Sequence, residues 1–494
     1  MGLIRRQSIA GTIYSYIGVV LGFIITAILY TRALTTDQVG LLRVMVSYAT
    51  LFAMFASLGF NSVTIRLFTH FRDQAKGHHG FLGLSLIISF AGFVISALIY
   101  LALRHFILAR GVEGSELFDT YFYYVVPLIF FTLMFNTLDT YYRVLYNAVK
   151  GIMVKEVAQR IVILGVIFAY FLGLISFHAT VLLYVAALIF PALWLFISLA
   201  VQKQLFLRPD FAFIGKDLRR EMTSVAFFGI VASFSGVVVM NIDILMINHL
   251  EGLSAAGIYT VTFYFATLIL IPLRTMGKIS AVVIADAWKA NDLETIASIY
   301  RKSSLSLSFI GFLLFIGIWG NIENVFQMIS TEYLPGKYVI LLVGLANLTD
   351  VALGVNPHII VNSKHYRFLS YSMIFFVACL VISNLLLIPP YGIVGAALAS
   401  LISKTIYNGI KYIYLYRKFG IQPFDIKFLL LIVVALFAYF ISTLMPALSN
   451  YILDIAVRSA LITALFTLPA YWFRISDDVN ERVNAILSQL KRRN

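Results

Sequence analysis

The sequence predicts an all-α integral membrane protein with about 14 transmembrane helices. The chain of 494 residues is 61% hydrophobic and only 12% charged, and its mean hydropathy of +0.92 is far above that of an ordinary soluble domain. Its apolar runs are continuous and about 20 residues long, which is the length that crosses the hydrocarbon as a helix. A barrel of membrane strands is excluded because its strands would alternate polar and apolar residues.

The first expected span follows Arg5 and Arg6, and we expect it to be retained, since its apolar run is too long for a signal peptide and lacks a small-residue cleavage site. The later spans follow with short connections. The expected spans cover residues 8–31, 42–65, 81–103, 120–148, 157–176, 180–201, 223–247, 258–276, 303–319, 338–356, 368–388, 393–414, 428–446 and 455–473.

The basic residues predict the orientation, because cytoplasmic segments are enriched in Lys and Arg. With the N-terminus inside, most basic residues fall in inner segments such as 203–220 and 274–302. The outer segments hold only Arg32, Arg43, Arg104, Arg110, Lys337 and Arg458. Both termini are therefore expected in the cytoplasm. The net charge of +14 is explained by these clusters, so no nucleic-acid partner is expected.

A weak internal repeat predicts two similar halves. The segment TRALTTDQVGLLRVMVSYATL, from Thr31, aligns with INHLEGLSAAGIYTVTFYFATL, from Ile247, with Gly40 opposite Gly257. The repeat implies two six-helix bundles, 1–222 and 223–418, related by a pseudo-twofold axis along the membrane normal. Residues 419–494 then supply two extra helices and a cytoplasmic surface helix or frayed tail. Such halves suit alternating access through a cleft, although duplication without transport is the alternative.

Five segments carry a resemblance to a known family. They are TRALTTDQVG, NIDILMINHLEGLSAAGIY, NDLETIASIYRKS, TEYLPGKYVILLVGLAN and NLLLIPPYGIVGAALASLISK, in this order. In these segments the chain resembles the multidrug, oligosaccharidyl-lipid and polysaccharide exporter superfamily, and within it the Wzx-like polysaccharide flippases. The resemblance covers essentially the whole chain, and the order and spacing of the motifs carry it.

The resemblance implies a flippase that exports an undecaprenyl-pyrophosphate-linked oligosaccharide across the bacterial inner membrane, for O-antigen, lipopolysaccharide or exopolysaccharide synthesis. It implies antiport driven by H⁺ or Na⁺, no cofactor, a monomer among membrane lipids, and a glycan polymerase as a candidate partner. The lipid II flippases of the superfamily carry arginines inside the first two spans. Here the first span has no charge before Arg32, and Arg43 and Arg66 are placed near the ends of the second.

Lys404 is the deepest predicted cation, near the middle of the twelfth span. A charge there needs a partner or a wet cavity. Gly392, Ala396 and Ser400 form a ridge of small residues that leads to it, so Lys404, with Ser400 beside it, is a candidate for binding phosphate. The alternative is that the small residues pack against a helix and Lys404 pairs with a buried acid such as Asp350.

The remaining charged candidates divide into cations for the substrate and carboxylates for ion coupling. Asp139 and Arg143 are four residues apart, so they are expected to pair on one helix, with Arg143 able to turn toward pyrophosphate if Asp139 is protonated. Asp243 and Asp350 are the best carboxylates for H⁺ or Na⁺ coupling. The last candidates, at inner helix ends, receive the pyrophosphate first or reach to lipid headgroups: Arg66 and Arg274.

Two other functions are weighed. Cation-coupled efflux of amphipathic drugs fits the same fold, but the mixed signs of the deep charges favour an anionic substrate. A glycosyltransferase, ligase or polymerase needs carboxylates or a metal in a substantial extramembrane domain, which these short loops do not provide. No metal site is expected, because the adjacent His78 and His79 lack the spacing of ligands.

Overall fold

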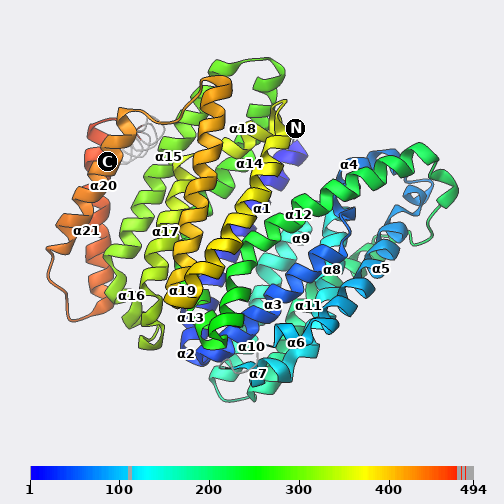
Figure 1. The fold of residues 1–494 in the computed structure, drawn as a ribbon, viewed down its shortest axis with the longest axis horizontal. Coiled ribbons are helices and arrows are strands. Elements are labelled where there is room, and N and C mark those ends of the chain that lie inside the picture. Colours follow the sequence, from blue (N-terminus) through cyan, green and yellow to red (C-terminus); the bar gives the residue numbers. More distant parts are fainter. Residues whose placement is uncertain (1, 109–113, 476–479, 481–483, 485–494) are drawn as a thin grey trace, which may run out of the picture. The chain divides into compact units, whose positions relative to one another are not determined.

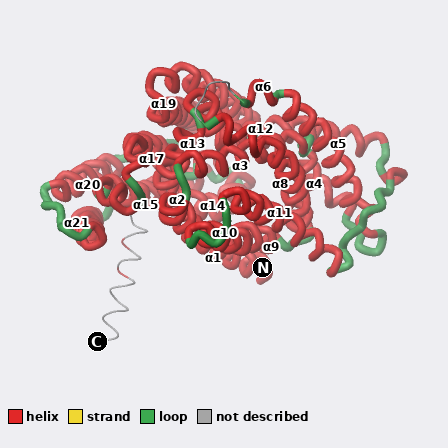
Figure 2. Tube along the Cα trace, turned by 90° about the horizontal axis from the view of Figure 1, so that it is seen from below, coloured by secondary structure: helices red, strands yellow, loops and turns green. Residues whose placement is uncertain are grey.

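A computed structural model describes residues 2–108, 114–475, 480 and 484. These residues form helices joined by loops, with no strand among them (Figure 2). Twelve helical segments of the described chain are long and apolar enough to cross a membrane. The prediction of an all-α membrane protein is therefore confirmed. The predicted surface helix after residue 475 lies almost entirely outside the described residues.

The twelve segments differ from the fourteen predicted spans at two places. The segment Arg367–Phe419 contains two predicted spans, 368–388 and 393–414. The predicted span 157–176 has no counterpart among the twelve. Its helix, α10 (Gln159–Phe171), is only 13 residues long and follows a charged π-helical turn. The number fourteen stays a prediction.

The long helix α19 (Tyr366–Phe419) is a helical hairpin. Phe368 and Tyr414 stack with their ring centroids 3.6 Å apart, although 46 residues of straight helix would separate them by about 69 Å. The chain turns back at Gly392, whose backbone angles of φ 54° and ψ −136° are not helical. Such a conformation is essentially open only to glycine, which explains why the apolar run is interrupted here.

The described chain divides into two compact units, Met1–Thr260 and Val261–Asn494. The first begins with eleven helices that the ribbon in Figure 1 colours from blue to green, with short 3-10 or π turns between some of them. They are α1 (Gly2–Phe23), α2 (Tyr30–Ala33), α3 (Thr36–Ala56), α4 (Phe60–Phe71), α5 (Phe81–Ala102), α6 (Arg104–Ile107), α7 (Ser115–Tyr121), α8 (Val125–Val144), α9 (Ala148–Met153), α10 and α11 (Phe177–Val201). The unit continues through α12 (Lys216–Glu251) into the start of α13 (Leu253–Thr267).

The second predicted span, 42–65, is wrong at both ends. Thr35 and Gln38 cap each other's backbone N–H groups, so helix α3 begins at Thr36. Leu58 and Gly59 then take positive φ angles of 47° and 69° and end it, before α4 continues the path. Arg43, which the sequence predicts near the end of this span, therefore lies about two turns inside the helix.

Helices α3 and α13 approach each other closely at two glycines. A Cβ on Gly40 would collide with the carbonyl oxygen of Leu253, and one on Gly257 would collide with that of Thr36. Thr36 also exchanges a 2.8 Å hydrogen bond with Ser254. The two glycines that the sequence repeat aligns thus let one backbone rest directly on the other.

The second unit contains the rest of α13 and helices that carry the candidate site. They are α14 (Ile271–Lys289), α15 (Leu293–Gly320), α16 (Ile322–Met328), α17 (Lys337–Ala352), α18 (Asn356–Asn362), α19, α20 (Ile426–Thr443) and α21 (Tyr451–Trp472). Helices α20 and α21 pack on each other and on α15, where Phe309 and Phe466 lie in one apolar core.

The boundary between the compact units falls after Thr260, later than the predicted boundary between the bundles 1–222 and 223–418. The reason is that α12 packs along α3 and α4, with the backbone of Gly59 against that of Ala226. The division into six, six and two helices, and the pseudo-twofold axis, remain predictions.

Candidate functional site

The hairpin α19 packs along α17 and places a group of polar side chains between the two helices in the second unit. Lys404 Nζ donates to Asn347 Oδ1 at 2.6 Å and lies 2.9 Å from Asp350 Oδ2. Asn408 Nδ2 donates to the other carboxylate oxygen of Asp350, also at 2.9 Å. Asn347, Asp350, Lys404 and Asn408 are called the α17–α19 polar cluster below.

Small residues make this contact possible. Ala396 is fully buried and Ser400 is 6% exposed, so the ridge that leads to Lys404 is covered by packing. A Cβ on Gly395 would collide with the carbonyl oxygen of Leu387 in the other arm of the hairpin. The small residues of the ridge therefore pack against a neighbouring helix, which is the alternative to a phosphate site. Ser400 is buried beside the cluster and is not open to a ligand.

The ion pair of the cluster is covered only in part. The side chain of Lys404 keeps 20% of its surface exposed and that of Asp350 keeps 22%. Lys404 is therefore held by a partner, as the second alternative expected, but remains accessible. An anion that approaches Lys404 competes with one carboxylate oxygen for the ammonium group.

A second group of charges lies in the first unit, on α8. Arg143 and Asp139 form the expected ion pair, with the Arg143 side chain 54% exposed and that of Asp139 only 6%. Lys155, which the sequence reasoning left out of the site, lies 4.8 Å above the Phe135 ring. Gly151 packs so closely on Asp139 that a Cβ there would collide with Oδ1. Arg143 can therefore meet an external anion, while Asp139 is enclosed.

Asp243 on α12 is the third candidate carboxylate. It is 7% exposed, and Tyr259 donates its hydroxyl to Oδ2 at 3.0 Å. Near it, Arg43 Nη2 lies 3.5 Å from Asn241 Oδ1. The sequence reasoning missed Arg43 as an interior cation, although the pair Thr35 and Gln38 is a capping signal from which the early start of α3 could have been predicted.

Arg66 and Arg274 do not join these groups. Arg66 lies exposed on α4 and Arg274 lies exposed on α14. Arg274 donates no hydrogen bond to the described α17–α19 polar cluster, which lies in the same unit. Among the described residues there is also no set of three His, Cys, Asp or Glu side chains placed to hold a metal ion.

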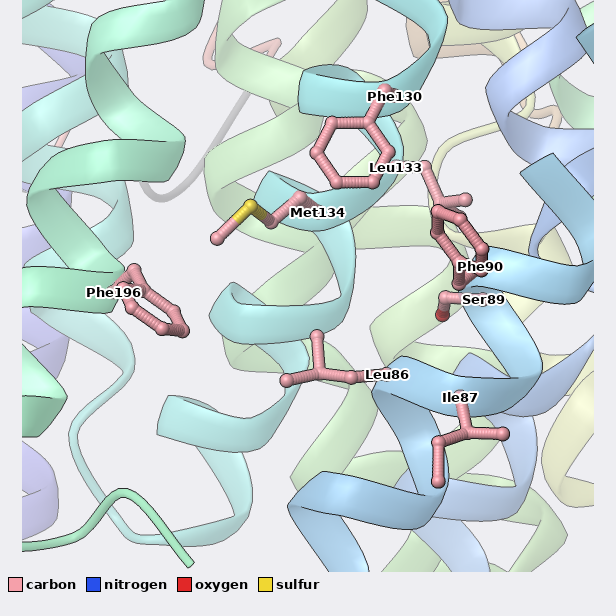
Figure 3. Close-up of a pocket in the computed structure, with 8 residues that line it drawn as sticks. All are labelled: Leu86, Ile87, Ser89, Phe90, Phe130, Leu133, Met134 and Phe196. Atoms are coloured by element: carbon pink, nitrogen blue, oxygen red, sulfur yellow. The ribbon is translucent and has the colours of Figure 1, made fainter. Parts of the chain in front are cut away.

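Two cavities in the first unit differ in chemistry. One, of about 380 Å³, lies between α5, α8 and α11. Figure 3 shows that its lining is apolar apart from one hydroxyl: Leu86, Ile87, Ser89, Phe90, Phe130, Leu133, Met134 and Phe196. Ser89 is already bonded to Thr137, so this cavity suits a hydrocarbon chain and not a phosphate. The other, of about 480 Å³, includes the cationic side chain of Arg219.

Solved structures of two kinds share this fold. The lipid II flippase MurJ in an inward closed conformation matches with a TM-score of 0.73 and 14% identity over 94% of this chain and 99% of that chain. An inward-facing multidrug resistance MATE family transporter of the MOP superfamily matches with a TM-score of 0.61 and 13% identity over 81% of this chain and 97% of that chain. At these identities the likeness concerns the fold.

Sequence comparison gives a narrower result. No curated protein sequence matches significantly. The model of the family described as polysaccharide biosynthesis protein matches residues 5–283, more than half of the chain. This protein therefore belongs to the polysaccharide biosynthesis protein family.

Proposed function

We propose that this protein is a flippase, not an enzyme, which moves an undecaprenyl-pyrophosphate-linked oligosaccharide from the inner to the outer leaflet of a bacterial inner membrane. The family match and the fold of known exporters support a membrane transport role in glycan synthesis. The observation that carries the choice of an anionic substrate is the Lys404 ammonium, part-exposed within a helix that is long and apolar enough to span the membrane.

In this proposal the pyrophosphate takes the place of Asp350 at Lys404. Asn347 continues to accept from Lys404 and keeps its side chain in position. Asn408 continues to donate to Asp350 and stabilises the released carboxylate. The Lys404 ammonium already has a strong acceptor, the Asp350 carboxylate, which the pyrophosphate replaces. The free energy of this exchange is therefore the difference between the free energies of two ion pairs, and not the full strength of either.

A coupling cation, H⁺ or Na⁺, drives the transport cycle. It does so by changing the charge balance at an ion pair such as that of Asp350 and Lys404. Asp350 is the carboxylate whose partner is itself the proposed substrate-binding cation, and Asp139 and Asp243 are the corresponding groups in the first unit. The two six-helix bundles open the site alternately to either side of the membrane. The protein works as a monomer with both termini in the cytoplasm, close to a glycan polymerase.

The test in cells uses a bacterium that lacks its own polysaccharide flippase and supplies the matching lipid-linked oligosaccharide. The native chain should restore surface glycan, and Lys404→Met should reduce it at equal protein level. The matched control is Lys418→Met, because Lys418 lies on the same helix but is exposed. Full export by the Lys404 variant would remove this lysine from the substrate site, and no export by the native chain would count against the proposed substrate.

A second candidate function is cation-coupled export of amphipathic drugs, favoured by the fold shared with the MATE family transporter. Overexpression should then lower drug susceptibility, and Asp350→Asn should abolish that protection. Unchanged susceptibility to a panel of cationic drugs, together with restored surface glycan, decides for the flippase.

A further inference from the structure

Lys411 is a buried lysine that neither the proposed substrate contact nor the ion pair uses. It lies on α19, seven residues after Lys404, and is 3% exposed. Its Nζ lies 4.1 Å from the centroid of the Tyr407 ring. It forms no ion pair with any carboxylate of the described chain. A buried ammonium without a carboxylate partner is costly, so this lysine requires an explanation.

Both oxygens of the neighbouring carboxylate, Asp350, already have a hydrogen-bond partner. Asp350 Oδ2 accepts from Lys404 and Oδ1 accepts from Asn408. Asp350 is nevertheless close enough to act electrostatically on Lys411, as is Lys404. Two ammonium groups would therefore share one carboxylate, which leaves one surplus positive charge in a covered place if both lysines carry their protons.

Within the part of the chain that the structure describes, no other charged group acts on Lys411 to balance that charge. Helix α17 contributes Asp350, and its own helix contributes Lys404 and the Tyr407 ring. Helix α18, which also packs on α19, carries His358, but this ring lies against Gly277 of α14. The surplus is removed most directly if Lys411 is uncharged while Lys404 holds Asp350.

From this geometry we infer that Lys411 takes up a proton when a phosphate of the substrate displaces Asp350 from Lys404, and the inference rests on the proposed flippase function. In this proposal the Lys411 amine is neutral while Lys404 holds Asp350. When a phosphate of the substrate takes Lys404, the released Asp350 carboxylate turns to Lys411, whose nitrogen lone pair takes one proton from water. One proton is bound together with the substrate, no covalent bond of the substrate changes, and the reverse exchange releases both. This proton balances the charge at the site, and it is separate from the coupling cation whose gradient drives export.

The experiment measures protons taken up on binding, by titration calorimetry of the full chain in detergent at about pH 9 in buffers of different ionisation enthalpy. Farnesyl diphosphate is the probe. The native chain and the control Lys418→Met should take up about one proton per probe bound, while Lys411→Met, which cannot be protonated, and Lys411→Arg, which is always charged, should take up none. Equal uptake in all four proteins would overturn the inference.

A second measurement, of folding stability against pH, needs no substrate. It separates the proposed flippase function from the proposed role of Lys411. If folding requires a neutral Lys411, the unfolded chain binds one more proton, so the folding equilibrium should rise by up to about tenfold per pH unit between about pH 8 and 10. This part of the pH dependence should vanish in Lys411→Met and persist in Lys418→Met. A native chain that shows it but does not bind the probe counts against the proposed function alone. A pH dependence unchanged in Lys411→Met counts against the role of Lys411.

Discussion

The ion pair of the α17–α19 polar cluster makes the sharpest prediction for stability, tested by a double-mutant cycle. Lys404→Met leaves the Asp350 carboxylate with only Asn408 as a partner, and Asp350→Asn leaves the ammonium without its counter-charge. Breaking a buried pair costs about 3–5 kcal/mol and an exposed one about 0–1 kcal/mol. With about a fifth of each side chain exposed, each single variant should lose about 2 kcal/mol.

The double variant, Lys404→Met with Asp350→Asn, removes both charges and should lose less than the two single losses added. We expect a coupling free energy of about 1–2 kcal/mol, within the range for residues in contact. In a unit of this size a loss of about 2 kcal/mol corresponds to a fall in Tm of roughly 4–8 °C.

The assay follows thermal unfolding in detergent with a thiol-reactive fluorogenic maleimide. Cys379 is the single cysteine of the chain and lies part-buried in α19, so its labelling reports on the helix that carries Lys404. Lys418→Met is the control and should leave the transition in place. Strictly additive losses, or a Tm unchanged by Asp350→Asn, would refute the reasoning that this pair is a coupled, partly desolvated contact.

Two further predictions concern the hairpin and a loop outside the spans. Gly392→Ala should lower stability by about 1–3 kcal/mol, since alanine is strained at φ 54°. The control is Gly409→Ala, at a helical position where a Cβ would meet open space, and it should stabilise the protein by about 0.5–1 kcal/mol. If both variants change the stability equally, Gly392 is not the residue at which the hairpin turns. The side-chain hydrogen bond from His79 lowers the pKa of Asp210, so Asp210→Asn should destabilise at pH 7 and lose this effect as the pH falls through and below about 4. A loss that is constant from pH 7 to 3 in thermal scans would show that the carboxylate charge is not involved.

Much of the fold could be predicted from composition, because an apolar run of membrane length has few other structures open to it. The pairing of Asp139 with Arg143 also followed from spacing alone, since residues four apart meet on one helix. The break between the predicted spans 368–388 and 393–414 contains Gly392, where the structure turns, and the helix continues through Pro389 and Pro390 before that turn.

The rest required tertiary information. The partner of Lys404 lies on another helix, so the sequence left the choice between phosphate and Asp350 open. Lys411 falls near the end of the predicted span 393–414, and its burial depends on how α17 and α18 pack on α19. Arg43 was misplaced because hydropathy marks where a helix is apolar, and not where capping residues begin it.

The most direct test of the flippase account is transport in liposomes of purified protein with a fluorescent undecaprenyl-pyrophosphate-linked sugar. A membrane-impermeant quencher reports how much of the lipid has crossed. The native chain under a proton gradient should equilibrate the lipid between leaflets much faster than protein-free liposomes, and Lys404→Met should be slower than Lys418→Met. Rates for the native chain equal to those of empty liposomes would contradict the account.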